Sequence, residues 1–194
     1  MGRLKESDPP DGGWGWVIVF SAFTIQMIVN GSQLTTGLLY VSLKNYFNES
    51  ATTTAWVLSL STALMQMSGP LGTYIANKFG IRPTVIIGGA VSTAGFLLSS
   101  FAPNVYYLYF THGIVASIGH GLCFGQSLAI LPYYFEKRFP IASSLTSSGT
   151  CVGLIVYSLL YQVFLEIYGW KGTYLLVSAL NAHLILCGVL FRPI

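Results

Sequence analysis

The side chains that could do chemistry in this chain are uncharged amides, hydroxyls and imidazoles set in apolar segments. Over residues 15–40 the polar positions are spaced by four, three and four residues, which places them on one face of a helix. Residues 55–76 carry a similar stripe. Two stripes on neighbouring helices indicate a shared water-accessible cavity. The alternative is that these side chains form hydrogen bonds between the helices. The stripes contain Gln26, Asn30, Gln33 and Gly37, then Ser59, Thr62, Gln66, Gly69 and Thr73.

Three histidines also lie in apolar segments. His112 and His120 are two helical turns apart, and His183 comes later in the chain. Because an unperturbed imidazole titrates near pH ~6.5, a histidine in a cavity could carry a proton. His120 is therefore a candidate cavity residue. The commoner arrangement is a neutral histidine that is bonded to a neighbouring helix.

Several classes of function are not supported by the sequence. It has no G-x-S-x-G elbow, no phosphate loop, no zinc-binding spacing and no basic patch. Cys123, Cys151 and Cys187 fall in apolar runs and are interpreted as packing residues. We therefore predict that the chain is not an enzyme, uses no cofactor or metal, and does not bind nucleic acid.

The composition indicates a membrane protein. Charged residues make up 8% of the 194 residues and hydrophobic ones 53%, whereas soluble domains carry roughly 25% charged residues. Crossing a bilayer takes roughly 20 apolar residues. We predict an all-α membrane protein with a cytoplasmic segment at 1–13 and one transmembrane domain at 14–194. Its six spans are expected at about 15–40, 55–76, 84–102, 105–132, 142–165 and 173–192.

Small residues recur at helical spacing in two of these spans. Gly113, Ser117, Gly121 and Gly125 stand at every fourth position, and Gly149 and Gly153 repeat the spacing further on. Small residues let membrane helices approach closely. We interpret these positions as packing sites within the bundle, with a dimer face as the alternative.

The positive charges predict the orientation, because lysine and arginine favour cytoplasmic loops. Only Lys44 and Lys171 fall on the predicted outer side. An integral, plasma-membrane location with both termini in the cytoplasm is expected. Asn48, in the sequon Asn48-Glu49-Ser50, would lie in an outer loop where glycosylation is possible. The residues on the predicted inner side are Arg3, Lys5, Lys78, Arg82, Lys137, Arg138 and Arg192.

Three stretches resemble the monocarboxylate transporter family of the major facilitator superfamily. The first opens the first span, the second surrounds the start of the fifth, and the third is the loop between the second and third spans. Asn77 stands where that loop usually has an aspartate. The matching residues are Asp11, Gly12, Gly13, Trp14, Gly15 and Trp16; then Tyr134, Phe135, Lys137, Arg138, Gly149 and Gly153; then Asn77, Lys78, Gly80 and Arg82.

The resemblance implies the N-terminal half of a twelve-helix carrier that moves a small monocarboxylate-like solute by alternating access. In that family the 77–82 loop would act as a cytoplasmic latch. The proton-coupled members have a lysine where Leu34 stands here, so the sequence is more similar to the atypical members. Asn30, Gln33, Leu34, Gln66 and His120 are the predicted substrate-cavity residues.

The partners implied are the solute, the lipid bilayer and a single-span immunoglobulin-type glycoprotein that escorts some family members. A second hypothesis comes from a different class. The chain would then be a truncated, non-transporting membrane protein that associates with full-length carriers or with such escorts.

Overall fold

The computed structural model describes residues 12–47 and 50–191, and every regular element within these ranges is helical. Asp11 and Asn48 lie outside the described residues. The elements are α1 Trp14–Phe47, α2 Ala51–Phe79, α3 Ile81–Ser99, α4 Val105–Leu108, η1 Tyr109–Ala116, α5 Ser117–Ala129, η2 Leu131–Tyr133, α6 Phe139–Asn181 and α7 His183–Leu190.

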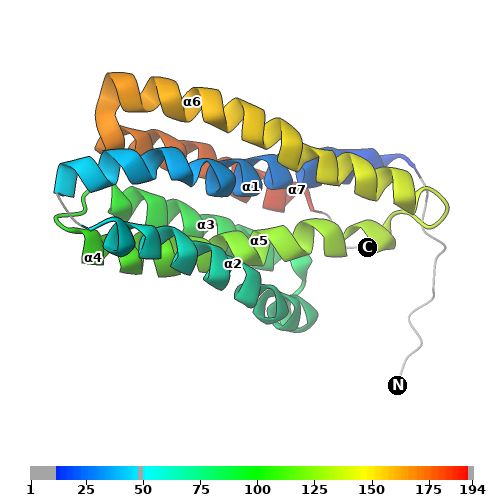
Figure 1. Cartoon of the computed structure of the whole chain (residues 1–194). Coiled ribbons are helices and arrows are strands. Elements are labelled where there is room, and N and C mark those ends of the chain that lie inside the picture. The colour runs from blue at the N-terminus through cyan, green and yellow to red at the C-terminus, as the bar shows by residue number, and fades with distance from the viewer. Residues whose placement is uncertain (1–11, 48–49, 192–194) are drawn as a thin grey trace.

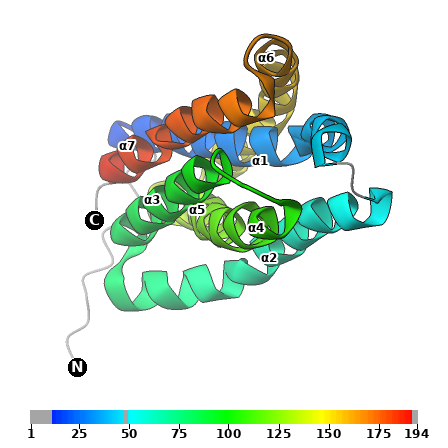
Figure 2. The same ribbon diagram turned by 90° about the vertical axis from the view of Figure 1, so that its left-hand side faces the viewer.

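The long helices lie side by side in one bundle (Figure 1). After rotation by 90°, α3 and α5 are seen between α2 on one side and α1, α6 and α7 on the other (Figure 2). The central position of α3 and α5 explains why their glycines and serines are buried while the outward residues of α6 are apolar and exposed.

α6 consists of two arms that reverse direction at Gly169 (Figure 1). The backbone there has φ 64° and ψ −174°, a conformation that glycine adopts readily because it has no Cβ. The first arm leads to this turn, and the second returns along the bundle into α7. The turn falls within residues 166–172, where a link between two spans was predicted.

Among the described residues, four stretches are long and apolar enough to cross a membrane: Trp14–Phe47, Ile81–Ser99, Val105–Tyr133 and Phe139–Leu190. The last of these contains the reversal at Gly169 and therefore supplies two passes. α2 has 29 residues, or roughly 43 Å of helix, enough for a hydrocarbon core about 30 Å thick. It is less apolar because serine, threonine, glycine and Pro70 interrupt its hydrophobic residues.

Glycines mark the closest approaches between helices. Gly153 of α6 faces the backbone of Met27, and a Cβ on Gly31 of α1 would lie 2.8 Å from the Gly153 carbonyl oxygen. Gly119 of α5 meets Gly88 of α3, where an added Cβ would lie 2.5 Å from the carbonyl oxygen. These contacts support the interpretation of the small residues as packing sites within the bundle.

The pass that begins at Val105 is irregular. A single turn of α-helix, α4, is followed by the π-helix η1 over Tyr109–Ala116, and only then by α5. The Ser117 hydroxyl donates to the carbonyl oxygen of His112 at 3.0 Å. π-helices are rare and occur often at functional sites.

Candidate functional site

The first polar junction joins α1 to α2 and α5. Gln33 of α1 donates from Nε2 to Ser61 Oγ at 2.9 Å and to Thr62 Oγ1 at 3.2 Å. The Ser61 hydroxyl lies 2.7 Å from that of Ser117. A single α1 amide thus holds two α2 hydroxyls, and the bonds continue to α5 in the middle of the bundle.

The second junction lies about two turns earlier on α1. Gln26 donates from Nε2 to Ser127 Oγ of α5 at 2.9 Å, and Asn30 donates from Nδ2 to Gln26 Oε1 at 2.6 Å. The Thr150 hydroxyl of α6 reaches the same oxygen at 3.5 Å. Gln26 is buried, whereas Asn30 is half-buried. Asn30 is therefore oriented by a buried partner but still has an accessible edge.

The structure places four of the five predicted cavity residues on accessible parts of α1 and α2. Leu34 is 57% exposed, Gln66 is exposed, and Asn30 and Gln33 are half-buried. The sequence allows two interpretations of these polar residues, a shared cavity and hydrogen bonds between helices, and both are relevant here. The Gln33 amide bonds between α1 and α2, whereas the Asn30 amide bonds to Gln26 within α1. Their outer edges, with the exposed Gln66, form an uncharged polar strip. We call Asn30, Gln33, Leu34 and Gln66 the α1–α2 strip.

His120 does not belong to the α1–α2 strip. Its side chain is 1% exposed, and Nε2 lies 2.7 Å from Oδ1 of Asn181 in the second arm of α6. Nδ2 of the same amide donates to the Val177 carbonyl oxygen at 2.9 Å, so Oδ1 is the acceptor and the histidine is the donor. His120 is predicted to line the cavity. In the structure its Nε2 is occupied by a hydrogen bond between α5 and the second arm of α6.

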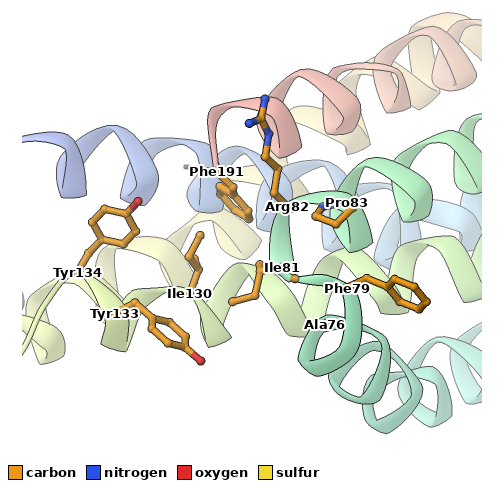
Figure 3. Close-up of a pocket in the computed structure, with 10 residues that line it drawn as sticks. Ala76, Phe79, Ile81, Arg82, Pro83, Ile130, Tyr133, Tyr134 and Phe191 are labelled. Carbon is orange, nitrogen blue, oxygen red and sulfur yellow. The ribbon is translucent and has the colours of Figure 1, made fainter. Parts of the chain in front are cut away.

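A pocket of about 340 Å³ lies at one end of the bundle, beside the last residues of α2 and α7, the first residues of α3, and η2 (Figure 3). Of the predicted latch residues, Gly80 and Arg82 line it, while Asn77 and Lys78 are exposed. Arg82 and Tyr133 point away from each other on opposite sides (Figure 3). The pocket residues are Ala76, Phe79, Gly80, Ile81, Arg82, Pro83, Ile130, Tyr133, Tyr134 and Phe191.

The first two motif stretches meet at this end of the bundle. Gly15 of α1 faces Phe135, and a Cβ on Gly15 would lie 2.8 Å from Cζ of that ring. Trp16 packs edge-on against Phe135 with ring centroids 5.4 Å apart. Lys137 and Arg138 are exposed in the link that follows, and Trp14 is half exposed. Gly12 and Gly13 precede α1, and Gly13 has φ 59°.

Sequence reasoning missed the hydroxyl partners Ser117, Ser127 and Thr150. Their only signal was a small hydroxyl in an apolar helix, which is common in membrane spans and does not identify its partner. The residues 26, 30 and 33 could be found because amides are rarer there and because their spacing follows the helical period.

The family model described as Major Facilitator Superfamily matches residues 15–194. The chain belongs to the major facilitator superfamily. Curated relatives include monocarboxylate transporter 9 of Gallus gallus, 41% identical over 96% of this chain and 37% of that protein. Monocarboxylate transporter 13 of Bos taurus is 39% identical over 97% of this chain and 44% of its own length.

Solved structures of peptide transporters share the fold. A peptide transporter POT in complex with sulfate superposes with a TM-score of 0.76 at 18% identity, covering 96% of this chain and 38% of that one. A POT family transporter with a thioalcohol-conjugated peptide gives 0.76 at 22% identity, covering 94% and 40%. The predicted class, an all-α membrane protein with the six-helix N-terminal half of a facilitator bundle, is confirmed.

The resemblance to the monocarboxylate transporters is also confirmed, since relatives named monocarboxylate transporters 9, 11, 12 and 13 match nearly the whole chain. These relatives are named as transporters rather than enzymes, in agreement with the prediction of a non-enzyme. The chain spans about two fifths of the length of the curated relatives it matches.

Proposed function

We propose that this facilitator chain supplies one wall of a membrane carrier for a small, monocarboxylate-like organic solute, which works by alternating access. The observation that carries the proposal is the α1–α2 strip. Amide groups with one buried, hydrogen-bonded end and one accessible edge can bind a polar solute without first changing conformation. In carriers of this type the solute site lies near the midplane, at the interface of the two halves.

The strip limits how the solute is bound. Leu34 is the most exposed of its α1 residues and provides an apolar surface beside the Gln33 amide. Asn30, Gln33 and Gln66 offer hydrogen bonds but no charge. The N–H groups of Asn30 and Gln33 already donate to Gln26, Ser61 and Thr62, so the exposed amide of Gln66 would be the donor that holds a carboxylate, without an ion pair. The predicted latch role of residues 77–82 at the helix-end pocket forms part of the same proposal.

Replacing Gln33 with leucine tests the strip. In proteoliposomes that contain this chain together with the other half of the carrier and are loaded with unlabelled solute, we expect counterflow of labelled small monocarboxylates. Because the change removes the amide that faces the solute and bonds Ser61 and Thr62, uptake should fall by about tenfold or more, the equivalent of one to two lost hydrogen bonds.

Gln162→Leu is the matched control for this experiment, because Gln162 is an exposed glutamine of α6 whose Nε2 donates to Glu166 Oε1 at 3.4 Å. It should leave uptake unchanged. Equal uptake by the two variants would contradict the assignment of the strip. Absence of uptake of every organic acid tried, together with co-purification of the chain with a full-length carrier or an immunoglobulin-type escort, would favour the non-transporting alternative.

We further propose a plasma-membrane location with both termini in the cytoplasm. The support is the distribution of positive charge, with Lys78, Arg82, Lys137 and Arg138 at one end and Lys44 and Lys171 at the other.

Asn48 gives the measurement for this orientation. In a glycosylating host, enzymatic removal of N-glycans should increase the electrophoretic mobility of the wild-type chain and leave that of Asn48→Gln unchanged. Asn30→Gln, which alters the sequon within α1, is the control and should still carry the glycan. Biotinylation of an added N-terminal tag on intact cells would contradict the orientation.

A further inference from the structure

A second group of polar side chains lies inside the bundle, away from the α1–α2 strip. His112 of η1 is 1% exposed and Tyr174 of the second arm of α6 is 0% exposed. Their ring centroids are 5.6 Å apart at an interplanar angle of 70°. Phe96 of α3 packs edge-on against His112 at 5.2 Å. The group therefore joins three elements in the interior.

The polar atoms of this group have no protein partner. Both ring nitrogens of His112 and the hydroxyl of Tyr174 are buried without a hydrogen bond. More than nine in ten buried polar groups in proteins bond to protein or to ordered water. Because the rings of His112 and Tyr174 are neighbours, a polar ligand between them would supply the missing partners of both.

His120 is a useful comparison because it is buried to the same extent in the same pass. Its Nε2 donates to Asn181 Oδ1 at 2.7 Å, and the Ser92 hydroxyl donates to the same oxygen at 3.2 Å. The fold can therefore give a ring nitrogen of a buried histidine a protein partner. The unpartnered nitrogens of His112 are thus a property of that site and not a general result of burying imidazoles.

The backbone at His112 is a second, independent sign. The residue lies within η1, and its carbonyl oxygen accepts from the Ser117 side chain five residues further on. A π-helix is less stable than an α-helix and is kept mainly where it positions a functional group. Here it is His112 that the irregular turn presents to Tyr174.

The surroundings decide the charge state of the group. The titratable side chains that face His112 are His120 from α5 and Tyr174 from α6, while α3 presents Phe96. None of these is a carboxylate that could pair with an imidazolium inside a membrane. A neutral imidazole has one donor and one acceptor nitrogen, and a tyrosine hydroxyl can donate and accept. Water, with two to four partners, matches this set.

We propose that His112 and Tyr174 bind internal water in a hydration site separate from the transport face. The site links η1 to the second arm of α6 through bonds that can exchange. It is independent of which solute the carrier moves.

A double-mutant cycle of the purified chain in detergent tests the proposal. His112→Phe and Tyr174→Phe each remove one partner of the water, so each should lower the thermal unfolding midpoint by roughly 2–10 °C. The double variant should lose clearly less than the sum of the two, because it removes both partners together. Tyr106→Phe, at an exposed tyrosine, should leave the midpoint unchanged.

Hydroxyl-radical footprinting by X-ray radiolysis and mass spectrometry gives a measurement on the wild-type chain. Radicals formed from bound water should label Tyr174 although it is 0% exposed, and His112→Phe should reduce this labelling at least severalfold. The proposal is overturned if Tyr174 and His112 stay unlabelled while Tyr106 is labelled. It is also overturned if both single variants raise the midpoint additively, as expected for a dry cluster held by edge-to-face ring contacts.

Discussion

Gly121→Ala is expected to lower the thermal unfolding midpoint of the chain. Gly121 lies where α5 crosses α2, and a Cβ at this position would overlap the Ser68 hydroxyl and the carbonyl oxygen of Met65. The backbone oxygen can move only if the two helices separate. Overpacking of this kind costs about 1–3 kcal/mol, which corresponds to roughly 2–10 °C in a domain of this size. Circular dichroism or a dye-based thermal scan in detergent would measure it.

Gly125→Ala is the matched control, because it makes the same change one turn further along α5. The nearest atom to a Cβ there is the Gly69 carbonyl oxygen at 4.0 Å. Its midpoint should stay level or rise slightly, since alanine favours helix over glycine by up to about 1 kcal/mol. An equal fall in the unfolding midpoint of both variants would show that the fall depends on the regular spacing of the glycines along α5. The close contact between α2 and α5 at Gly121 would then not be its cause.

Much of the fold could be predicted from hydropathy because the length of a membrane helix is set by the bilayer. The exceptions have local causes. α3 ends at Ser99, earlier than the predicted 102, because the amides of Phe101 and Ala102 bond only three residues back, to Leu98 and Ser99, and tighten the chain into a turn. The π-helix η1 has no sequence pattern of its own, because its apolar composition suits an α-helix equally well.

The candidate site was predictable in part for a similar reason. Helical spacing places Gln26, Asn30 and Gln33 on one face whatever the tertiary structure, and the structure brings Gln33 within 3.2 Å of Thr62 in the second stripe. The direction in which His120 faces depends instead on Asn181, 61 residues later in the chain. No periodicity reveals a pair so distant, so this residue was assigned to the wrong environment.

The second large effect is expected for the His120–Asn181 pair. Replacing Asn181 with leucine should destabilise the bundle. Leucine keeps the branched shape of asparagine with larger end groups, and it removes the oxygen that accepts from His120 and Ser92. Two donors are then buried without acceptors, and each can cost about 1–3 kcal/mol. Ser92 lies one turn after Gly88 and can turn to the carbonyl oxygen of that residue, so most of the loss should come from His120. The expected fall in the unfolding midpoint is roughly 2–10 °C.

The cause of that fall can be tested by removing the orphaned donor as well. His120→Phe in the Asn181→Leu background should recover part of the lost midpoint, because no imidazole N–H is left unpaired. Asn45→Leu, at an exposed asparagine of α1, is the control and should have little effect. If the double variant instead loses the sum of its two single losses, the two side chains act independently. The 2.7 Å contact would then contribute no coupling between α5 and the second arm of α6.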